Sequence, residues 1–295
     1  MSPANHRRVP IAVAVAILIA VSAAAWMWTL RTSSKSKTSV KRLSGTLLIA
    51  GGGVLPKSIR ERFIELAGGS KARVVVVPGH EPDEAGLARQ RGFWSDFNVE
   101  SLTILSANSA QEANSETFLE SLRSATGVWL GGGTQVFLAE RYVDTQAERE
   151  LFLLLGRGGV VGGTSAGASI MTRTMIVDGR HDAVLGRGLG LLPDAVIDQH
   201  FLKRNRLARL LGVLRQHPDL IGFGIDERTA LEFHVLNHSL SVVGDSYVMA
   251  VVAGSDDRPP RLEILKPTDQ ITLEGLRDPK VPVAQSYDFE EYLSD

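Results

Sequence analysis

The sequence predicts an α/β protein with a mostly parallel sheet that is covered by helices on both faces. Two observations lead to this prediction. Short runs of Val, Ile and Leu alternate along the chain with longer amphipathic segments, a pattern typical of crossover connections between parallel strands. The apolar runs are also nearly continuous, as expected for strands that are buried on both faces. In such a sheet, ligands bind at the carboxyl ends of the strands.

The expected strands are short apolar runs. Seven of them cover residues 47–50, 73–78, 99–105, 127–130, 158–161, 195–198 and 221–225. Two further short strands, over 247–252 and 261–265, are expected to form a sheet edge near the end of the chain.

Amphipathic segments between these runs predict the helices. A proline opens the segment 56–67 and a glycine pair follows it, which is a good start and stop signal. Two more helices are expected over 115–125 and 145–155. Asn205 is expected to cap a further helix, because an apolar stripe follows at helical spacing: Leu207, Leu210, Leu211 and Leu214.

Composition excludes several classes of protein. The chain has 295 residues, of which 44% are hydrophobic, so one large domain with a sizeable core is expected. A net charge of -1 argues against a nucleic-acid-binding protein. With no cysteine, a thiol nucleophile, a disulfide and a zinc–cysteine site are excluded. No plausible cluster of metal ligands occurs, and neither a metal nor an organic cofactor is expected.

The N-terminal region predicts export. Residues 9–30 carry no charge and include tryptophans near their far end, and about 20 apolar residues can cross a bilayer as a helix. Ala23 and Ala25 also form an acceptable signal cleavage site. Basic residues on both sides leave the orientation open. The protein is expected to be membrane-anchored or secreted, with a signal anchor or signal peptide, a flexible linker and a folded domain over 1–30, 31–44 and 45–295.

One glycine-rich turn has the spacing of a nucleophile elbow. Gly163, Ser165 and Gly167 form the G-x-S-x-G pattern between an apolar run and a helix-like run. Small residues are needed here, because a side chain at either glycine would collide with the neighbouring strand or helix. The N–H of Ala166 would lie at a helix start, aimed where an oxyanion would form. The alternative is an ordinary glycine-rich turn with a buried serine.

A serine nucleophile needs a base, and the base needs an orienting partner. His200 is the best-placed histidine, because it follows the apolar run 195–197 at the expected catalytic edge. His80 is a weaker candidate, and a packing or capping role is the alternative for either. Asp226 and Glu227 follow the strand 221–225. Adjacent residues of an extended segment point to opposite faces, so only one of these carboxylates should reach the imidazole.

Glycines and arginines complete the set of candidates. Gly132, within the glycine run 131–133, could donate a second hydrogen bond to an oxyanion. A bare turn or a phosphate loop is the alternative, but neither this run nor 51–53 has a phosphate-binding pattern. Three arginines follow His200: Arg204, Arg206 and Arg209. They form either a solvated face or a site for substrate carboxylates. Arg206 and Arg209 would share one helix face.

Together these segments resemble the cyanophycinase family, which forms one group of serine peptidases with the aspartyl dipeptidases. The resemblance covers roughly residues 45 to 255 and rests on four blocks in the same order: GGTSAGASIM, GLGLLPDAVIDQHF, KRNRLARLL and GIDERTAL. It implies a three-layer α/β/α fold of the class I glutamine-amidotransferase (flavodoxin-like) type and a catalytic domain over 45–295. It also implies a homodimer.

The resemblance also implies residue roles and a substrate. Ser165 would be the nucleophile, His200 the general base and Glu227 the acid, while Ala166 and Gly132 would bind the oxyanion. The substrate would be cyanophycin, a poly-aspartate whose side chains carry arginine, and the product β-aspartyl-arginine. The implied substrate contacts are Gln135, Asp198, Gln199, Arg204, Arg206 and Arg209.

Two departures from the family leave alternatives open. The segment between Met175 and Gly188 is shorter than in cyanophycinases, and Thr134 stands where an acidic residue is usual. An aspartyl or isoaspartyl dipeptidase acting on short peptides is therefore the first alternative, with Asp178 or Asp182 as its acid. A non-catalytic exported binding protein and an α/β-hydrolase esterase, in which His234 follows Asp226, are the others.

Overall fold

The computed structural model describes residues 44–255, 258–267 and 269–278. The signal anchor or signal peptide predicted over 1–30 lies outside the described residues, as does the linker except for Ser44. Among the residues that are described, no helix combines the length and the apolar character needed to cross a membrane.

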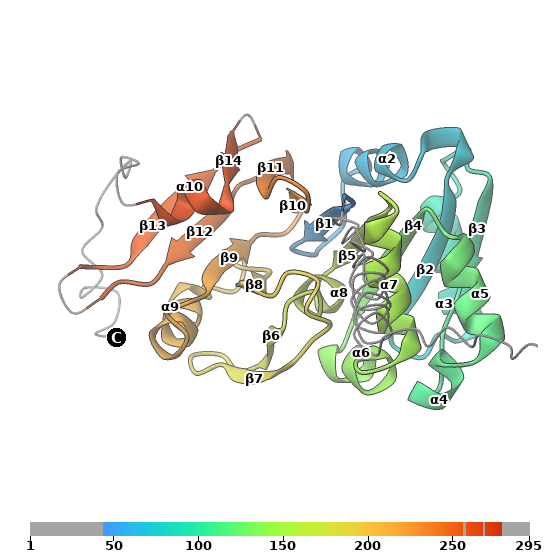
Figure 1. Cartoon of the computed structure of the whole chain (residues 1–295), viewed down its shortest axis with the longest axis horizontal. Coiled ribbons are helices and arrows are strands. Elements are labelled where there is room, and N and C mark those ends of the chain that lie inside the picture. Colours follow the sequence, from blue (N-terminus) through green and yellow to red (C-terminus); the bar gives the residue numbers. More distant parts are fainter. Residues whose placement is uncertain (1–43, 256–257, 268, 279–295) are drawn as a thin grey trace, which may run out of the picture. The chain divides into compact units, whose positions relative to one another are not determined.

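The predicted α/β class is confirmed. The largest sheet has eight strands in the order β14-β11-β10-β1-β5-β4-β2-β3 (Figure 1). The five strands from β1 to β3 in this order run parallel, each paired with its neighbours. Each matches an expected strand to within a few residues: β1 (Thr46–Ala50), β2 (Arg73–Gly79), β3 (Ser101–Ile104), β4 (Gly127–Gly133) and β5 (Val160–Thr164).

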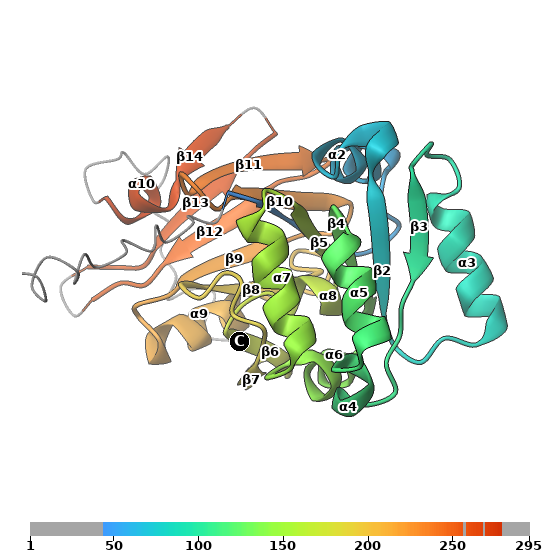
Figure 2. The same ribbon diagram turned by 45° about the vertical axis from the view of Figure 1, so that its right-hand side comes forward.

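Helices cover both faces of the parallel strands, because alternate side chains of each strand point to opposite faces. Leu47 and Ile49 of β1 belong to the same apolar core as α5 and α7, whereas Leu48 packs with α2 in a second core. Figure 2 shows α5 and α7 lying across one face of the sheet. The helices are α2 (Lys57–Leu66), α3 (Glu84–Trp94), α4 (Ala110–Ala113), α5 (Glu116–Ser124), α6 (Gln135–Tyr142), α7 (Gln146–Gly156), α8 (Ala166–Ser169), α9 (Leu207–Gln216) and α10 (Leu273–Arg277), with a short 3₁₀ helix η1 (Gly69–Lys71).

The prediction of a single sheet is wrong for two strands. β8 (Ala195–Gln199) and β9 (Ile221–Ile225) are parallel to each other, but they belong to a separate four-stranded sheet in the order β13-β12-β9-β8. The expected late strands, β12 (Val248–Val252) and β13 (Arg261–Leu265), complete that sheet.

Antiparallel strands extend the main sheet where none was expected. After β9 the chain turns tightly and returns as β10, which pairs antiparallel with β1. Strand–helix alternation predicts only parallel crossovers, so it gives no sign of such a turn. The strands that were not predicted from the sequence are β10 (Thr229–His234), β11 (Ser239–Gly244), β14 (Gln270–Thr272) and the hairpin β6 (Thr174–Asp178) and β7 (Val184–Arg187).

The predicted cap of α9 is also wrong. The residue at the N-cap position is Arg206, which makes no side-chain capping hydrogen bond. Asn205 instead has φ +48 and closes a turn by donating its N–H to Leu202 O at 3.0 Å. Asn adopts this left-handed conformation more readily than most residues, so the same residue type that favours a cap also favours this turn. The apolar stripe is as expected, with Leu210, Leu211 and Leu214 buried.

Candidate active site

Ser165 lies on a sharp turn between β5 and α8. Its backbone has φ +53 and ψ −112, a conformation that is strained for a residue with a side chain. A Cβ built at Gly163 would lie 2.5 Å from Gly167 O, and one built at Gly167 would lie 2.0 Å from Leu130 O. The elbow therefore has no room for side chains at its two glycines, as the G-x-S-x-G pattern predicts.

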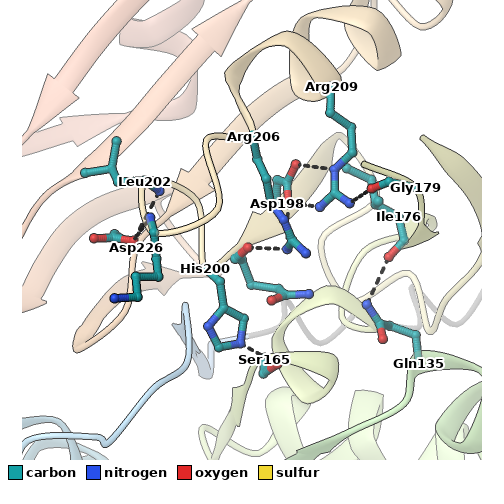
Figure 3. Close-up of polar contacts among 12 residues, drawn as sticks. Gln135, Ser165, Ile176, Gly179, Asp198, His200, Leu202, Arg206, Arg209 and Asp226 are labelled. Atoms are coloured by element: carbon teal, nitrogen blue, oxygen red, sulfur yellow. Dashed lines mark hydrogen bonds and ion pairs between the residues drawn. The ribbon is translucent and has the colours of Figure 1, made fainter. Parts of the chain in front are cut away.

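His200 follows β8 and meets this serine. The hydroxyl Oγ of Ser165 is 3.0 Å from His200 Nε2 (Figure 3). The backbone of His200 has φ +50, and its N–H donates to Gly51 O at 2.8 Å. The turn after β8 thus aims the imidazole at the elbow from the other sheet.

Of the two adjacent carboxylates after β9, Glu227 contacts the imidazole. Its Oε1 is 2.7 Å from His200 Nδ1. Asp226 points elsewhere and accepts hydrogen bonds from the N–H groups of Leu202 and Lys203, each at 3.1 Å. The two neighbours therefore face opposite ways, in agreement with the geometry of an extended segment.

The other candidate acids and histidines occupy different places. Asp178 and Asp182 are exposed in the β6–β7 hairpin. His80 is exposed after β2, with Nδ1 3.4 Å from Gly132 O. His234, on which an esterase triad would depend, pairs with buried Glu232 at 2.9 Å on β10. The histidine that the structure places against Ser165 is thus His200.

The environment of His200 favours a neutral imidazole. Burial lowers its pKa below the ordinary value of 6.5, and the positive charge of Arg204 lowers it further, against the opposing hydrogen bond to Glu227. If Nδ1 donates its proton to Glu227, Nε2 is left as the acceptor that faces Ser165. This arrangement suits a group that takes a proton from a hydroxyl near neutral pH.

The glycine run at the end of β4 passes beside the elbow. A Cβ built at Gly132 would lie 3.7 Å from Ser165 Cβ. Ala166 is fully buried at the start of α8, directly after Ser165. Both residues that were predicted to bind an oxyanion therefore lie next to the serine. Thr134, at the point where the family pattern is broken, caps α6 by accepting from Phe137 N–H at 3.2 Å.

Three predicted substrate contacts form a buried cluster. Arg209 Nε donates to Asp198 Oδ2 at 2.9 Å, and the two side chains are 2% and 0% exposed. Arg209 also donates to Gly179 O of the β6–β7 hairpin. Arg206 Nη1 contacts Asp198 Oδ1 at 3.4 Å and Gln199 O at 2.5 Å. Arg206 and Arg209 thus converge on one carboxylate, as residues on a shared face would; Arg209 is buried and Arg206 is partly buried.

Burial shifts the pKa of two members of this cluster. It raises the pKa of Asp198, although the guanidinium of Arg209 opposes the shift, and it lowers the pKa of Arg206. Arg204 differs from its neighbours because it is exposed. Of the three predicted arginines, Arg204 is the one that presents its charge at the surface beside His200.

Two glutamine amides lie beside the cluster. Gln135, at the start of α6, donates from Nε2 to Ile176 O at 3.2 Å (Figure 3). Gln199 precedes His200 and is buried, and its Oε1 has no hydrogen-bond partner among the described residues. Gln199 thus has a free acceptor one residue from the imidazole, and a buried oxygen without a partner is costly. In the part of the chain that the structure describes, no three His, Cys, Asp or Glu side chains are grouped to hold a metal ion.

One element of the site was not found from the sequence. The glycine run 51–53, considered there only as a phosphate loop, packs against both His200 and Glu227. Three glycines directly after a strand at the expected catalytic edge were the available signal.

The fold and this arrangement of serine, imidazole and carboxylate define a serine-type hydrolase of the α/β class. Comparison with known proteins narrows the class. The sequence model of Peptidase family S51 matches residues 46–241. The chain therefore belongs to peptidase family S51 and is a serine-type peptidase, which confirms the resemblance found in the sequence.

Two curated relatives and one solved structure are similar to this chain. The chain is 34% identical over 220 residues to a cyanophycinase from Synechococcus elongatus, which covers 70% of this chain and 68% of the relative. It is 32% identical over 222 residues to one from Geminocystis herdmanii (strain PCC 6308), covering 71% and 81%. The crystal structure of a peptidase from an acI-B1 Actinobacterium has the same fold, with a TM-score of 0.63 and 22% identity over 79% of this chain and 98% of that chain.

Proposed function

We propose that this peptidase hydrolyses aspartyl peptide bonds of the cyanophycin type through a triad of Ser165, His200 and Glu227. The observation that supports the proposal is one continuous series of hydrogen bonds. It runs from Ser165 Oγ to His200 Nε2 at 3.0 Å and from His200 Nδ1 to Glu227 Oε1 at 2.7 Å.

In the first step, Ser165 Oγ attacks the carbonyl carbon of the scissile bond while His200 Nε2 accepts the hydroxyl proton. The imidazolium that forms is stabilised by the carboxylate of Glu227. Negative charge develops on the carbonyl oxygen, and the N–H groups of Ala166 and the Gly132 turn donate to it. Each such donor contributes a factor of about 10²–10³ to the rate.

In the second step, the tetrahedral intermediate collapses and the C–N bond breaks. His200 gives its proton to the leaving amine, so the amine departs neutral and the acyl group remains as an ester on Ser165. A water molecule then loses a proton to neutral His200 and attacks the ester. When this second intermediate collapses, the bond from the carbonyl carbon to Ser165 Oγ breaks, His200 returns its proton to Oγ, and the acid is released.

The substrate class is supported by the relatives and by the charge beside the triad. Two relatives at 32–34% identity are named cyanophycinases. The exposed guanidinium of Arg204 suits a substrate rich in carboxylates, because forked, charge-assisted hydrogen bonds to carboxylates are strong. Gln135 and the free acceptor of Gln199 supply neutral polar groups for a peptide. The expected product of the polymer is β-aspartyl-arginine.

The test compares substrates on the full chain. Purified protein and its Ser165→Ala variant are incubated with cyanophycin, with β-aspartyl-arginine-containing short peptides and with α-aspartyl dipeptides, and the products are separated by mass. We expect β-aspartyl-arginine from the polymer, and a loss of about 10³-fold or more in the variant. Hydrolysis of the short peptides alone would favour the aspartyl dipeptidase alternative. An unchanged rate in Ser165→Ala would overturn the triad.

We propose further that the protein acts outside the cytoplasm as a homodimer. The uncharged segment 9–30 supports export, either as a membrane anchor or as a cleaved signal, with residues 45–295 as the catalytic domain. Cell fractionation with N-terminal sequencing tests export: a chain in the cytosolic fraction with its N-terminus intact would contradict it. Sedimentation of the purified protein tests the assembly.

A further inference from the structure

The carboxyl end of β1 contacts the backbone of every segment that carries a member of the proposed triad. Ala50 O accepts from Ser165 N–H at 3.0 Å, and the next carbonyl, Gly51 O, accepts from His200 N–H at 2.8 Å. The third, Gly52 O, accepts from Arg228 N–H at 3.0 Å, directly after Glu227. Three consecutive carbonyl groups thus hold three segments that are far apart in the sequence.

The side chains of His200 and Glu227 also pack against this turn. A Cβ built at Gly52 would lie 2.4 Å from His200 Cε1 and 2.6 Å from His200 Nε2. One built at Gly53 would lie 2.9 Å from Glu227 Oε2. The imidazole and the carboxylate therefore pack on bare backbone, and both glycines have positive φ, +114 and +71.

Hydrogen bonds alone would leave the imidazole free to tilt. His200 is attached through a flexible side chain, and its Nε2 must stay within proton-transfer reach of Ser165. The backbone of Gly52 closes the space that a tilted ring would need. Because β1 pairs with both β5 and β10, the turn is fixed to the strand before the nucleophile and to the strand after the acid.

We propose that residues 50–53 are a positioning element that sets the mutual distances of Ser165, His200 and Glu227, and that Gly52 is its critical positioning residue. The element touches the base and the acid and takes no part in bond making. The reaction that it would serve rests on the proposed function, whereas its effect on the His200–Glu227 contact does not.

The chain offers a matched control for a test at Gly52. Gly68 has φ +112, almost the same as Gly52, but a Cβ built there meets its nearest described atom only at an ordinary 3.8 Å. Gly52→Ala and Gly68→Ala therefore both place a side chain at nearly the same positive φ, and only the first forces a methyl group against the imidazole.

The experiment has two readouts on the full chain. The first is kcat and KM for peptide hydrolysis. The second is the ¹H–¹⁵N spectrum of the histidine rings, in which the Nδ1 proton of His200 reports the hydrogen bond to Glu227 without any substrate. In Gly52→Ala we expect kcat to fall by about 10²-fold with little change in KM. We also expect the low-field Nδ1 proton signal to be lost, while Gly68→Ala keeps both at wild-type values.

A folded Gly52→Ala variant with the wild-type Nδ1 signal and kcat would overturn the proposal. If Gly52→Ala does not fold, Gly53→Ala decides, because its methyl group would press on the far end of the Glu227 side chain, at 2.9 Å. That variant is expected to shift or lose the Nδ1 signal and to lower kcat by about 10-fold, and an unchanged signal overturns the proposal. A wild-type protein without peptidase activity would refute the proposed function instead, since the ring spectrum would still report on the positioning.

Discussion

The nucleophile and its two partners are built in different ways. Ser165 is set by a short local motif, in which two glycines leave room for a strained turn between a strand and a helix. His200 and Glu227 lie 35 and then a further 27 residues along the chain, at the ends of β8 and β9 in another sheet. The conformation of the serine thus follows mainly from its own strand–helix turn, although β1 also contacts that turn, whereas contacts between distant segments place the base and the acid. We call the turn that carries Ser165 the nucleophile arm, and the ends of β8 and β9 that carry His200 and Glu227 the base–acid arm. A substitution that disturbs one arm should therefore leave the geometry of the other unchanged.

The largest expected effect is on kcat, and it distinguishes the two adjacent carboxylates after β9. Glu227→Gln removes the charge that stabilises the imidazolium, and we expect kcat to fall by about 10³–10⁴-fold. Asp226→Asn is the matched control, because Asp226 contacts the backbone of Leu202 and Lys203 and not the imidazole. We expect it to keep kcat within about 10-fold of the wild type. Equal losses in steady-state kinetics would show that the assignment of the acid is wrong.

The next effect concerns the buried ion pair beneath the base. Arg209→Met leaves the carboxylate of Asp198 without its main partner in a position that is 0% exposed. We expect the free energy of unfolding in urea to fall by about 3–5 kcal/mol. The double variant Asp198→Asn with Arg209→Met removes both charges and should recover part of that loss. A single variant as stable as the wild type would mean that the pair contributes nothing to holding the end of β8.

The elbow can be disturbed on its own. Gly167→Ala places a methyl group within 2.0 Å of Leu130 O, which forces the backbone to move. We expect a loss of about 1–3 kcal/mol in unfolding free energy, together with reduced activity and an unchanged Nδ1 proton signal of His200. Gly212→Ala in α9 is the control, since a Cβ built there meets nothing within 4 Å beyond its chain neighbours and the backbone of its own helix. It should be neutral or stabilising by up to about 1 kcal/mol. Loss of the His200 signal in Gly167→Ala would show that the two arms are not independent.

The smallest effect is on pH dependence. The pKa of His200 is lowered below 6.5 by burial and by Arg204, so the neutral base persists at mildly acidic pH. The acidic limb of kcat/KM is therefore expected below pH 6.5.

The same shift affects stability. Unfolding raises the pKa of His200 again, so this imidazole binds protons more tightly in the unfolded state. Its contribution to stability is therefore lost as pH falls below 6.5.

Arg204→Gln sharpens this prediction, because it removes one cause of the shift while leaving the burial of His200 in place. The pKa of His200, followed by its ring resonances, should rise only slightly, since charge effects at exposed groups are screened. The acidic limb should move to higher pH by the same amount. A limb that stays in place or moves to lower pH would contradict the role given to Arg204.

The contrast between the two arms also explains what the sequence could predict. The five parallel strands and the elbow follow from local patterns, namely continuous apolar runs and the spacing of Gly163, Ser165 and Gly167. The residues alone predicted only that one of Asp226 and Glu227 would face His200, and the family resemblance named Glu227 as the acid. Geometry between segments was needed to show that it is Glu227.

Most of these errors depend on contacts between residues far apart in the chain, whereas the error at Asn205 is local. Placement of β8 and β9 in a second sheet is decided by pairing with β12, which no local pattern reports. Asn205 was read as a cap, although a left-handed turn used the same preference of the residue. The buried pairing of Asp198 with Arg209 was not predicted, because the resemblance implied that both residues would contact substrate. The role of Gly52 depends on an imidazole far along the chain.

The account depends on one hydroxyl being made nucleophilic by an imidazole from the other sheet. The most direct measurement is covalent labelling of the full chain with a fluorophosphonate, followed by peptide mapping and mass spectrometry. We predict one label per chain, on Ser165, with labelling slowed strongly in His200→Gln and absent in Ser165→Ala. A label on a different residue, or the same rate of labelling of Ser165 with and without the imidazole, would contradict the account.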